Sequence, residues 1–103
     1  MQVTPNELKE RLSRGEKLDI LDVRSAAERE ICKLDGLWIP LEDLHSRFAE
    51  LDASQEVVVV CHHGIRSAHA VGFLRSQGFS KAQNLAGGID RWAEEVDPKM
   101  KRY

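Results

Sequence analysis

Cysteine is scarce in this sequence, and neither sign of charge is in clear excess. The 103 residues include two cysteines, Cys32 and Cys61, which are too few for a disulfide framework and lack the paired spacing of a structural zinc site. This usage fits a reducing compartment, so we expect a cytoplasmic protein. A formal net charge of -2 leaves no basic face for phosphates, which argues against a nucleic-acid partner.

Long hydrophobic runs are also missing. No apolar stretch approaches the roughly 18 residues that span a bilayer. The first ten residues have neither the basic nor the apolar region of a secretory signal. We therefore expect a soluble chain that has no membrane partner. Because the chain has the length of one small domain with a single core, we expect residues 1–103 to form one domain.

Strand and helix signals alternate along the chain. Thr4, Pro5 and Glu7 form a capping box that begins a helix, and a buried strand is expected at residues 18–23. Ser25 and Glu28 repeat the capping-box spacing after it. Further on, we expect a short strand near 37–40, a helical face over 41–51, a buried strand at 56–61, a helix ending at Gly78, a weak strand at 82–85 and a helix after Gly87 and Gly88. This order predicts an α/β fold, with a small, mainly parallel sheet of about five strands and helices on both faces.

Cys61 follows four consecutive valines, at the carboxyl end of the expected central strand, where ligands of open parallel sheets collect. The chain continues through His62, His63, Gly64, Ile65, Arg66 and Ser67 into a helix. A short loop at a helix start directs backbone N–H groups inward and favours an anion, and Arg66 adds a permanent positive charge. We therefore interpret Cys61 as a nucleophilic thiolate rather than a buried structural cysteine.

Four segments together resemble the single-domain rhodanese-like sulfurtransferases. They are CHHGIRS after the valines, LDVR at 21–24, IPL at 39–41 and NLAGGIDRWA at 84–93, and they cover nearly the whole chain in order. The common GHIPGA stretch of that family reads ICKLDGLW here, at 31–38. The resemblance implies the rhodanese fold and a sulfurtransferase activity.

The resemblance also implies a mechanism. Cys61 would take a sulfane sulfur from a small-molecule donor such as thiosulfate, hold it as a persulfide, and pass it to cyanide or a thiol. A protein persulfide is a further candidate partner. The backbone of residues 62–66 would surround the sulfur, and Arg66 would orient an anionic donor. Thiolate displacement at sulfur requires no metal, no cofactor and no dedicated general base.

Three alternatives remain open from the residues. A Cdc25-like phosphatase or arsenate reductase resembles rhodanese in fold, but its loop has five residues between cysteine and arginine, whereas this loop has four. A binding module that uses the fold without catalysis has no need for an intact cysteine and arginine. A metal site of Cys61, His62, His63 and His69 is disfavoured because adjacent residues on a tight loop seldom converge on one ion.

The neighbours of Cys61 have competing interpretations. Asp22 and Arg24 either brace the neighbouring loop, as the resemblance implies, or form a surface ion pair. Ser67 either donates to the cysteine sulfur or caps the helix. We expect His62 and His63 to be exposed side chains whose backbone matters more than their rings, although a protonated ring would attract an anionic donor.

The remaining large or reactive side chains are assigned to the interior. We expect Trp38 and Trp92 to fill the core. We expect Cys32 to be a partly buried, inert thiol rather than a residue that resolves an oxidised Cys61 as a disulfide.

Overall fold

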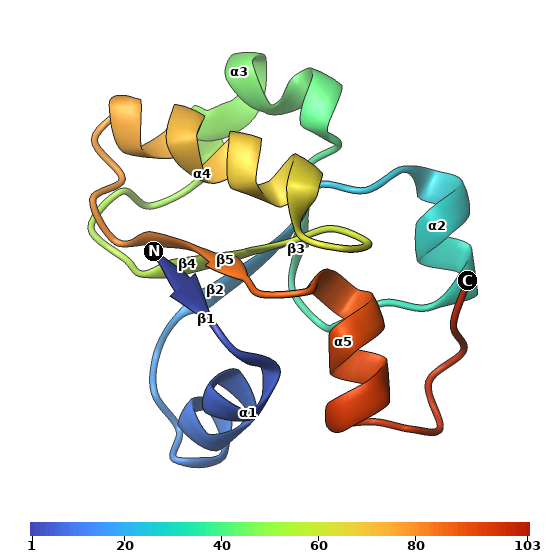
Figure 1. Cartoon of the computed structure of the whole chain (residues 1–103). Helices are drawn as coiled ribbons and strands as arrows, with labels where there is room; N and C mark the ends of the chain where they lie inside the picture. Colours follow the sequence, from blue (N-terminus) through green and yellow to red (C-terminus); the bar gives the residue numbers. More distant parts are fainter.

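The strands form one parallel sheet. A computed structural model describes residues 1–103 and has five strands in the order β1-β5-β4-β2-β3 (Figure 1). Every neighbouring pair is parallel. The strands are β1 (Gln2–Val3), β2 (Asp19–Asp22), β3 (Leu37–Trp38), β4 (Val57–Val60) and β5 (Ala82–Leu85). The predicted α/β class is therefore confirmed, and β4 occupies the centre of the sheet.

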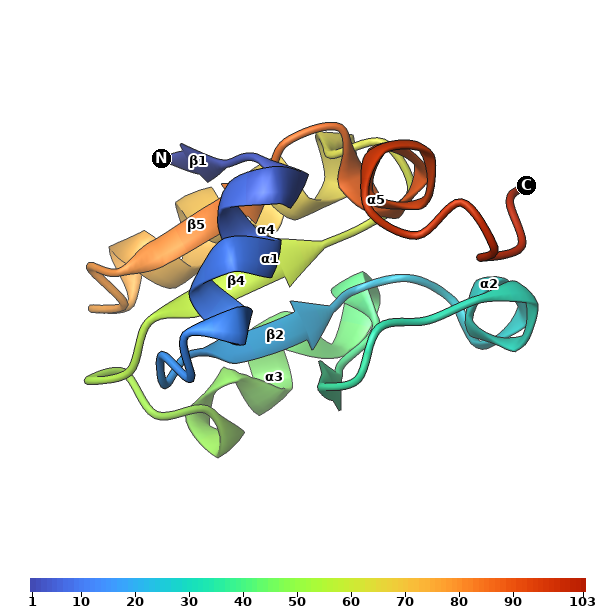
Figure 2. The ribbon, with the colours of Figure 1, turned by 90° about the horizontal axis from the view of Figure 1, so that it is seen from below.

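Helices cover both faces of this sheet. They are α1 (Pro5–Ser13), α2 (Ala26–Ile31), α3 (Leu44–Arg47), α4 (Ile65–Ser76) and α5 (Gly88–Glu95). Figures 1 and 2 show α3 and α4 on one face and α1 and α5 on the other, while α2 stands beyond the carboxyl ends of the strands. None of these helices combines the length and apolar character needed to cross a bilayer.

Both predicted capping boxes are present. The Thr4 hydroxyl accepts from the backbone N–H of Glu7 at 3.1 Å, and the Glu7 carboxylate accepts from the backbone N–H of Thr4 at 2.8 Å. Ser25 and Glu28 make the same reciprocal bonds at the start of α2. These bonds satisfy N–H groups that a helix leaves unpaired in its first turn, and they fix where the two helices begin.

Two parts of the chain differ from expectation. Residues 41–51 form no continuous helix: α3 lies between two 3-10 turns, Leu41–Asp43 and Phe48–Glu50. Apolar residues spaced three apart, Leu41 with Leu44 and Phe48 with Leu51, suit 3-10 turns as well as an α-helix. The edge strand β1 was not predicted, because two residues are too few to show a periodic pattern.

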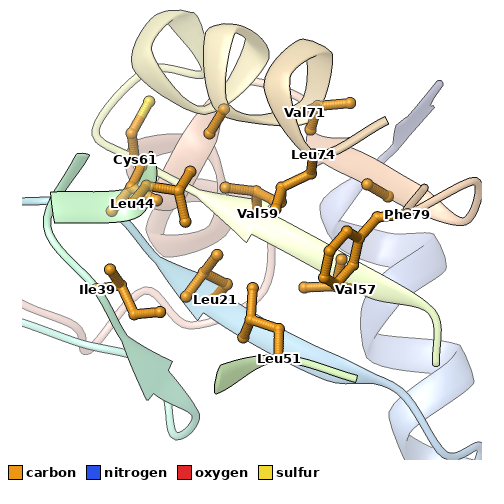
Figure 3. Close-up of a cluster of buried hydrophobic side chains, with 13 residues drawn as sticks. Leu21, Ile39, Leu44, Leu51, Val57, Val59, Cys61, Val71, Leu74 and Phe79 are labelled. Carbon is orange, nitrogen blue, oxygen red and sulfur yellow. The ribbon is translucent and has the colours of Figure 1, made fainter. Parts of the chain in front are cut away.

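The core lies in two layers that share β4. Val57 and Val59 pack with Leu44 and Leu74 on the α3/α4 face (Figure 3), whereas Val58 and Val60 pack on the α1/α5 face. All four valines are buried, which explains the absence of polar alternation in this strand. The central strand therefore provides a rigid support for the residue that follows it, Cys61.

Candidate active site

Cys61 lies where the chain leaves the central strand and turns into α4. The strand ends at Val60, and α4 begins at Ile65. Cys61 is only 1% exposed and belongs to the end of the core cluster under α3 and α4 (Figure 3). Burial keeps bulk water from the sulfur, which strengthens its interactions with nearby dipoles and charges.

Two polar groups contact the Cys61 sulfur. The backbone N–H of Gly64 donates to Sγ at 3.0 Å, and the Ser67 hydroxyl lies 3.2 Å from it. Gly64 adopts the left-handed conformation with a φ of 96°, which glycine adopts at little cost, and it is the N-cap of α4. The amide donor and the positive end of the helix dipole both favour an anionic sulfur.

Asn84, on β5, holds these two groups in place. Its side-chain Nδ2 donates to the Gly64 carbonyl at 2.9 Å, and its Oδ1 accepts a hydrogen bond from the Ser67 hydroxyl. Asn84 and Ser67 are both buried. One amide therefore fixes both the turn that carries the N–H donor and the hydroxyl beside the sulfur. Ser67 is the third residue of α4, so the alternative that it caps this helix is wrong.

The start of α5 clamps the same loop from the other side. The backbone N–H groups of Ile89 and Asp90 donate to the carbonyls of Cys61 and His62 at 2.9 and 3.1 Å. Gly88 permits this approach, since a Cβ atom there would come within 2.3 Å of the His62 carbonyl oxygen. Glycine at position 88, the first residue of α5, is therefore required by the close contact of two backbones.

Arg66, the expected donor-binding residue, is engaged by a carboxylate. Its Nη1 and Nη2 atoms lie 2.6 and 2.8 Å from the two oxygens of Glu28, in a bidentate pair. The hydrogen bonds that Arg66 donates hold the pKa of the Glu28 carboxyl far below its usual value, and the same bonds raise the pKa of Arg66.

Asp22 and Arg24 form a second pair, inside the protein. Nε and Nη2 of Arg24 donate to the two oxygens of Asp22 at 3.0 and 2.8 Å, and Arg29 adds a third bond at 2.9 Å. Arg24 also donates to the Cys32 carbonyl at 2.7 Å. Because both partners are buried, the interpretation as a surface ion pair is wrong. The pair fixes the chain on both sides of α2.

Tyr103 connects the two ion pairs. Its hydroxyl donates to Glu28 Oε2 at 2.6 Å and accepts from Nη1 of Arg24 at 3.0 Å. Its ring stacks on the His62 ring with centroids 3.8 Å apart. The C-terminal segment therefore lies against the candidate site, next to α2, as Figure 1 also shows.

The sequence similarity of this chain to a known protein family extends over most of its length. A family model described as "Rhodanese-like domain" matches residues 4–95. The chain belongs to this family. A rhodanese-related protein from Thermoplasma volcanium has a crystal structure that matches with a TM-score of 0.84 and 30% identity, covering 92% of each chain. The fold predicted from the resemblance is thus confirmed.

Curated relatives of this rhodanese-like domain carry sulfurtransferase names. A "Sulfurtransferase" of Allochromatium vinosum is 32% identical over 98 residues, which cover 94% of this chain and 92% of the relative. "Probable adenylyltransferase/sulfurtransferase MoeZ" of Mycobacterium tuberculosis is 38% identical over 104 residues, covering 98% of this chain and 26% of the relative. The chain therefore spans about a quarter of the length of MoeZ.

The histidines of the rhodanese-like loop lie outside the sulfur site. His63 is exposed as expected, but His62 is half-buried against the Tyr103 ring, so its expected exposure is wrong. Their ring nitrogens and an Asp90 oxygen lie within 4.8 Å of one another and could hold a metal ion, whereas Cys61 and His69 are not part of this group. Asp90 is paired with Arg102 at 3.0 Å, and Nε2 of His62 lies 2.8 Å from the Tyr103 carbonyl oxygen. A metal bound by the Asp90 carboxylate would compete with its contact to Arg102.

Two further expectations concern the two tryptophans and Cys32. Trp92 is buried as predicted, but Trp38 is 38% exposed, so its assignment to the core is wrong. Trp38 lies on the edge strand β3, and its indole N–H donates to the Arg24 carbonyl at 2.8 Å. Cys32 is partly buried, with its sulfur 3.9 Å from Nη1 of Arg24, and both cysteines are free.

Sequence reasoning missed three residues that the structure brings to the site of this rhodanese-like domain. Glu28 was interpreted only as the second half of a capping box, and Asn84 only as part of a motif. Tyr103 stood in a basic C-terminal stretch with no motif. The polar Asn84, between Gln83 and Leu85 on the expected strand, was the one local signal, since a polar side chain that a strand buries needs partners.

Proposed function

We propose that this rhodanese-like domain is a sulfurtransferase that carries sulfane sulfur as a persulfide on Cys61. The observation that carries the proposal is the buried sulfur with the Gly64 N–H directed at it from the start of a helix. Curated relatives named as sulfurtransferases support it. The four-residue interval between Cys61 and Arg66 supports sulfur transfer over phosphatase or arsenate reductase chemistry.

The reaction is a pair of displacements at sulfur. The Cys61 thiolate attacks the outer sulfur of a donor such as thiosulfate, the donor S–S bond breaks, and sulfite leaves with the bonding electron pair. An acceptor such as cyanide or a thiol then attacks the terminal sulfur of the persulfide and releases the Cys61 thiolate. Neither step requires an external oxidant or reductant, because the sulfane sulfur moves between nucleophiles.

The surrounding groups have distinct roles in this scheme. The Gly64 N–H stabilises the charge on the sulfur in the thiolate and persulfide states. The Ser67 hydroxyl, whose proton is donated to Asn84, lies beside the sulfur, and Asn84 positions both Ser67 and the Gly64 turn. Arg66 supplies positive charge beside the sulfur, and the buried pair of Asp22 and Arg24 supports the segment that carries Glu28.

Intact-protein mass spectrometry under non-reducing conditions tests the proposal. Mixing the protein with thiosulfate, or separately with cysteine persulfide, should add one sulfur atom, which cyanide then removes. Cys61→Ser should abolish the adduct with both donors, because a serine hydroxyl does not ionise in this range. A phosphatase would instead form a phosphocysteine from an aryl phosphate, and a binding module would form neither adduct.

Cys32→Ser is the matched control for the site of modification. It changes the other cysteine of the chain in the same way and should leave the adduct in place. The proposal fails if the mass of the protein is unchanged with both donors, or if the additional sulfur maps to Cys32.

A further inference from the structure

The guanidinium of Arg66, in the first turn of the helix that follows Cys61, is not free to bind an anion. Both terminal nitrogens of Arg66 face the two oxygens of Glu28. This bidentate geometry is the one that a guanidinium would otherwise offer to an oxyanion such as thiosulfate. A small anionic donor must therefore compete with a carboxylate that belongs to the protein.

Glu28 is held firmly in this position. Its Oε1 accepts from the backbone N–H of Ser25 at 3.2 Å, as part of the capping box of α2, and its Oε2 accepts from the Tyr103 hydroxyl at 2.6 Å. The Glu28 side chain is mostly buried, with 18% of its surface exposed. Three separate partners hold the carboxylate, so it is a fixed part of the site rather than a mobile surface group.

The charge of the site decides between classes of donor. Arg66 and Glu28 cancel one another, and the thiolate of Cys61 adds a negative charge. Thiosulfate brings two more negative charges to this place, whereas a persulfide borne on a thiol brings at most one at the reacting sulfur. Repulsion inside a poorly solvated site is stronger than in water, so the difference between the two donors is amplified there.

We propose that Glu28 is a specificity-determining residue: it slows the reaction with small dianionic donors relative to the reaction with persulfides carried on thiols. This inference rests on the sulfur-carrier function proposed above. In the favoured reaction, the Cys61 thiolate attacks the terminal sulfur of the donor persulfide. The donor S–S bond breaks, and the donor thiolate leaves with the electron pair. The proton of the persulfide remains on the transferred sulfur or passes to the departing thiolate.

Glu28→Gln tests this role with little change in shape. Glutamine also suits the third position of a capping box, so α2 keeps its first turn. The rate of Cys61 persulfidation is measured by intact mass with thiosulfate and with cysteine persulfide on the same preparation. The ratio of the two second-order rate constants is the readout, because the fraction of active protein cancels from it.

In the unaltered protein the ratio should favour cysteine persulfide. In Glu28→Gln it should shift toward thiosulfate by about tenfold or more, because removing one repulsive charge frees the guanidinium of Arg66. Glu30→Gln is the matched control: Glu30 is an exposed residue of the same helix without an ion pair, and its ratio should not change.

The outcomes separate the two proposals. An adduct in every protein with a ratio that Glu28→Gln leaves unchanged overturns the role of Glu28 and leaves the sulfur-carrier function standing. The same holds if Glu30→Gln shifts the ratio equally, or if the unaltered protein favours thiosulfate. No adduct from either donor in the unaltered protein overturns the sulfur-carrier function itself.

Discussion

The two arginine–carboxylate pairs near α2 are both bidentate, but their surroundings are very different. Between Arg24 and Asp22, the side chains are 0% and 5% exposed. Between Arg66 and Glu28, they are 38% and 18% exposed. Both pairs lie at the carboxyl edge of the sheet, and Tyr103 contacts both. Exposure is thus the main physical difference between them.

This difference assigns the pairs to different tasks. A buried pair cannot lose one partner without leaving an unsolvated charge, so it constrains the fold. A partly exposed pair leaves its remaining partner in contact with solvent when one charge is removed, so its loss costs the fold little. The inner pair, Asp22 with Arg24, therefore holds the chain around α2. The outer pair, Glu28 with Arg66, is available to control the chemistry at Cys61.

Asp22→Asn should have the largest effect, and it tests whether the buried pair constrains the fold. The change keeps the size of the side chain but leaves the Arg24 guanidinium buried without its counter-ion, and Arg29 also loses its partner. We expect the free energy of unfolding to fall by about 3–5 kcal/mol, which is a large part of the roughly 5–15 kcal/mol that holds a small domain together. Urea unfolding followed by circular dichroism measures this loss.

Asp19→Asn is the matched control for this change. Asp19 lies on the same strand, is half-buried, and makes no side-chain hydrogen bond or ion pair. Its substitution should change the free energy of unfolding by no more than about 0.5 kcal/mol. Equal effects of the two substitutions would show that the buried pair has no special structural role.

The outer pair should contribute much less to stability, and its contribution should depend on pH. We expect Glu28→Gln to lower the free energy of unfolding near neutral pH by at most about 1 kcal/mol. Because Arg66 lowers the pKa of Glu28 in the folded state, this contribution is present above the ordinary value of 4.5 and is lost as the pH falls below it. Urea unfolding at about pH 7 and about pH 3 should therefore show the difference between the two proteins shrink.

Glu30→Gln again serves as the control, since its difference from the unaltered protein should be small at both pH values. A loss in Glu28→Gln as large as that in Asp22→Asn would remove the distinction between the two pairs. A difference that grows toward low pH would contradict the lowered pKa of Glu28.

The contrast between the pairs also marks the limit of what the sequence could predict. Two capping boxes, four valines and the interval from Cys61 to Arg66 are local patterns, and they predicted α1, α2, β4 and the loop correctly. The missed contacts join residues far apart in the chain: Glu28 is 38 positions from Arg66 and 75 from Tyr103. No periodicity or spacing rule encodes such pairings, because the tertiary fold creates them.

Trp38 shows the same limit for burial. Its size and apolar ring favour the core, but β3 is an edge strand of two residues and leaves the ring partly in solvent above Arg29. Asn84 is the reverse case, a polar residue that the fold buries because it finds Ser67 and Gly64 as partners. Residue type alone gives the wrong placement when a specific hydrogen bond decides it.

The smallest expected effect is spectroscopic and concerns Tyr103, which contacts both pairs. Burial, followed by the hydrogen bond to Glu28, raises the pKa of Tyr103 from 10.0 to about 12. The neutral phenol therefore contributes stability that is complete below the ordinary pKa of 10.0 and is lost as the pH rises through about 12.

Because Tyr103 is the single tyrosine of the chain, its near-ultraviolet phenolate absorption reports this group alone. Far-ultraviolet circular dichroism in parallel separates ionisation from unfolding. Glu28→Gln should lower the midpoint, since the phenolate would no longer face a carboxylate, and Glu30→Gln should not. A midpoint near 10 in the unaltered, folded protein would mean that Tyr103 does not connect the two pairs in solution.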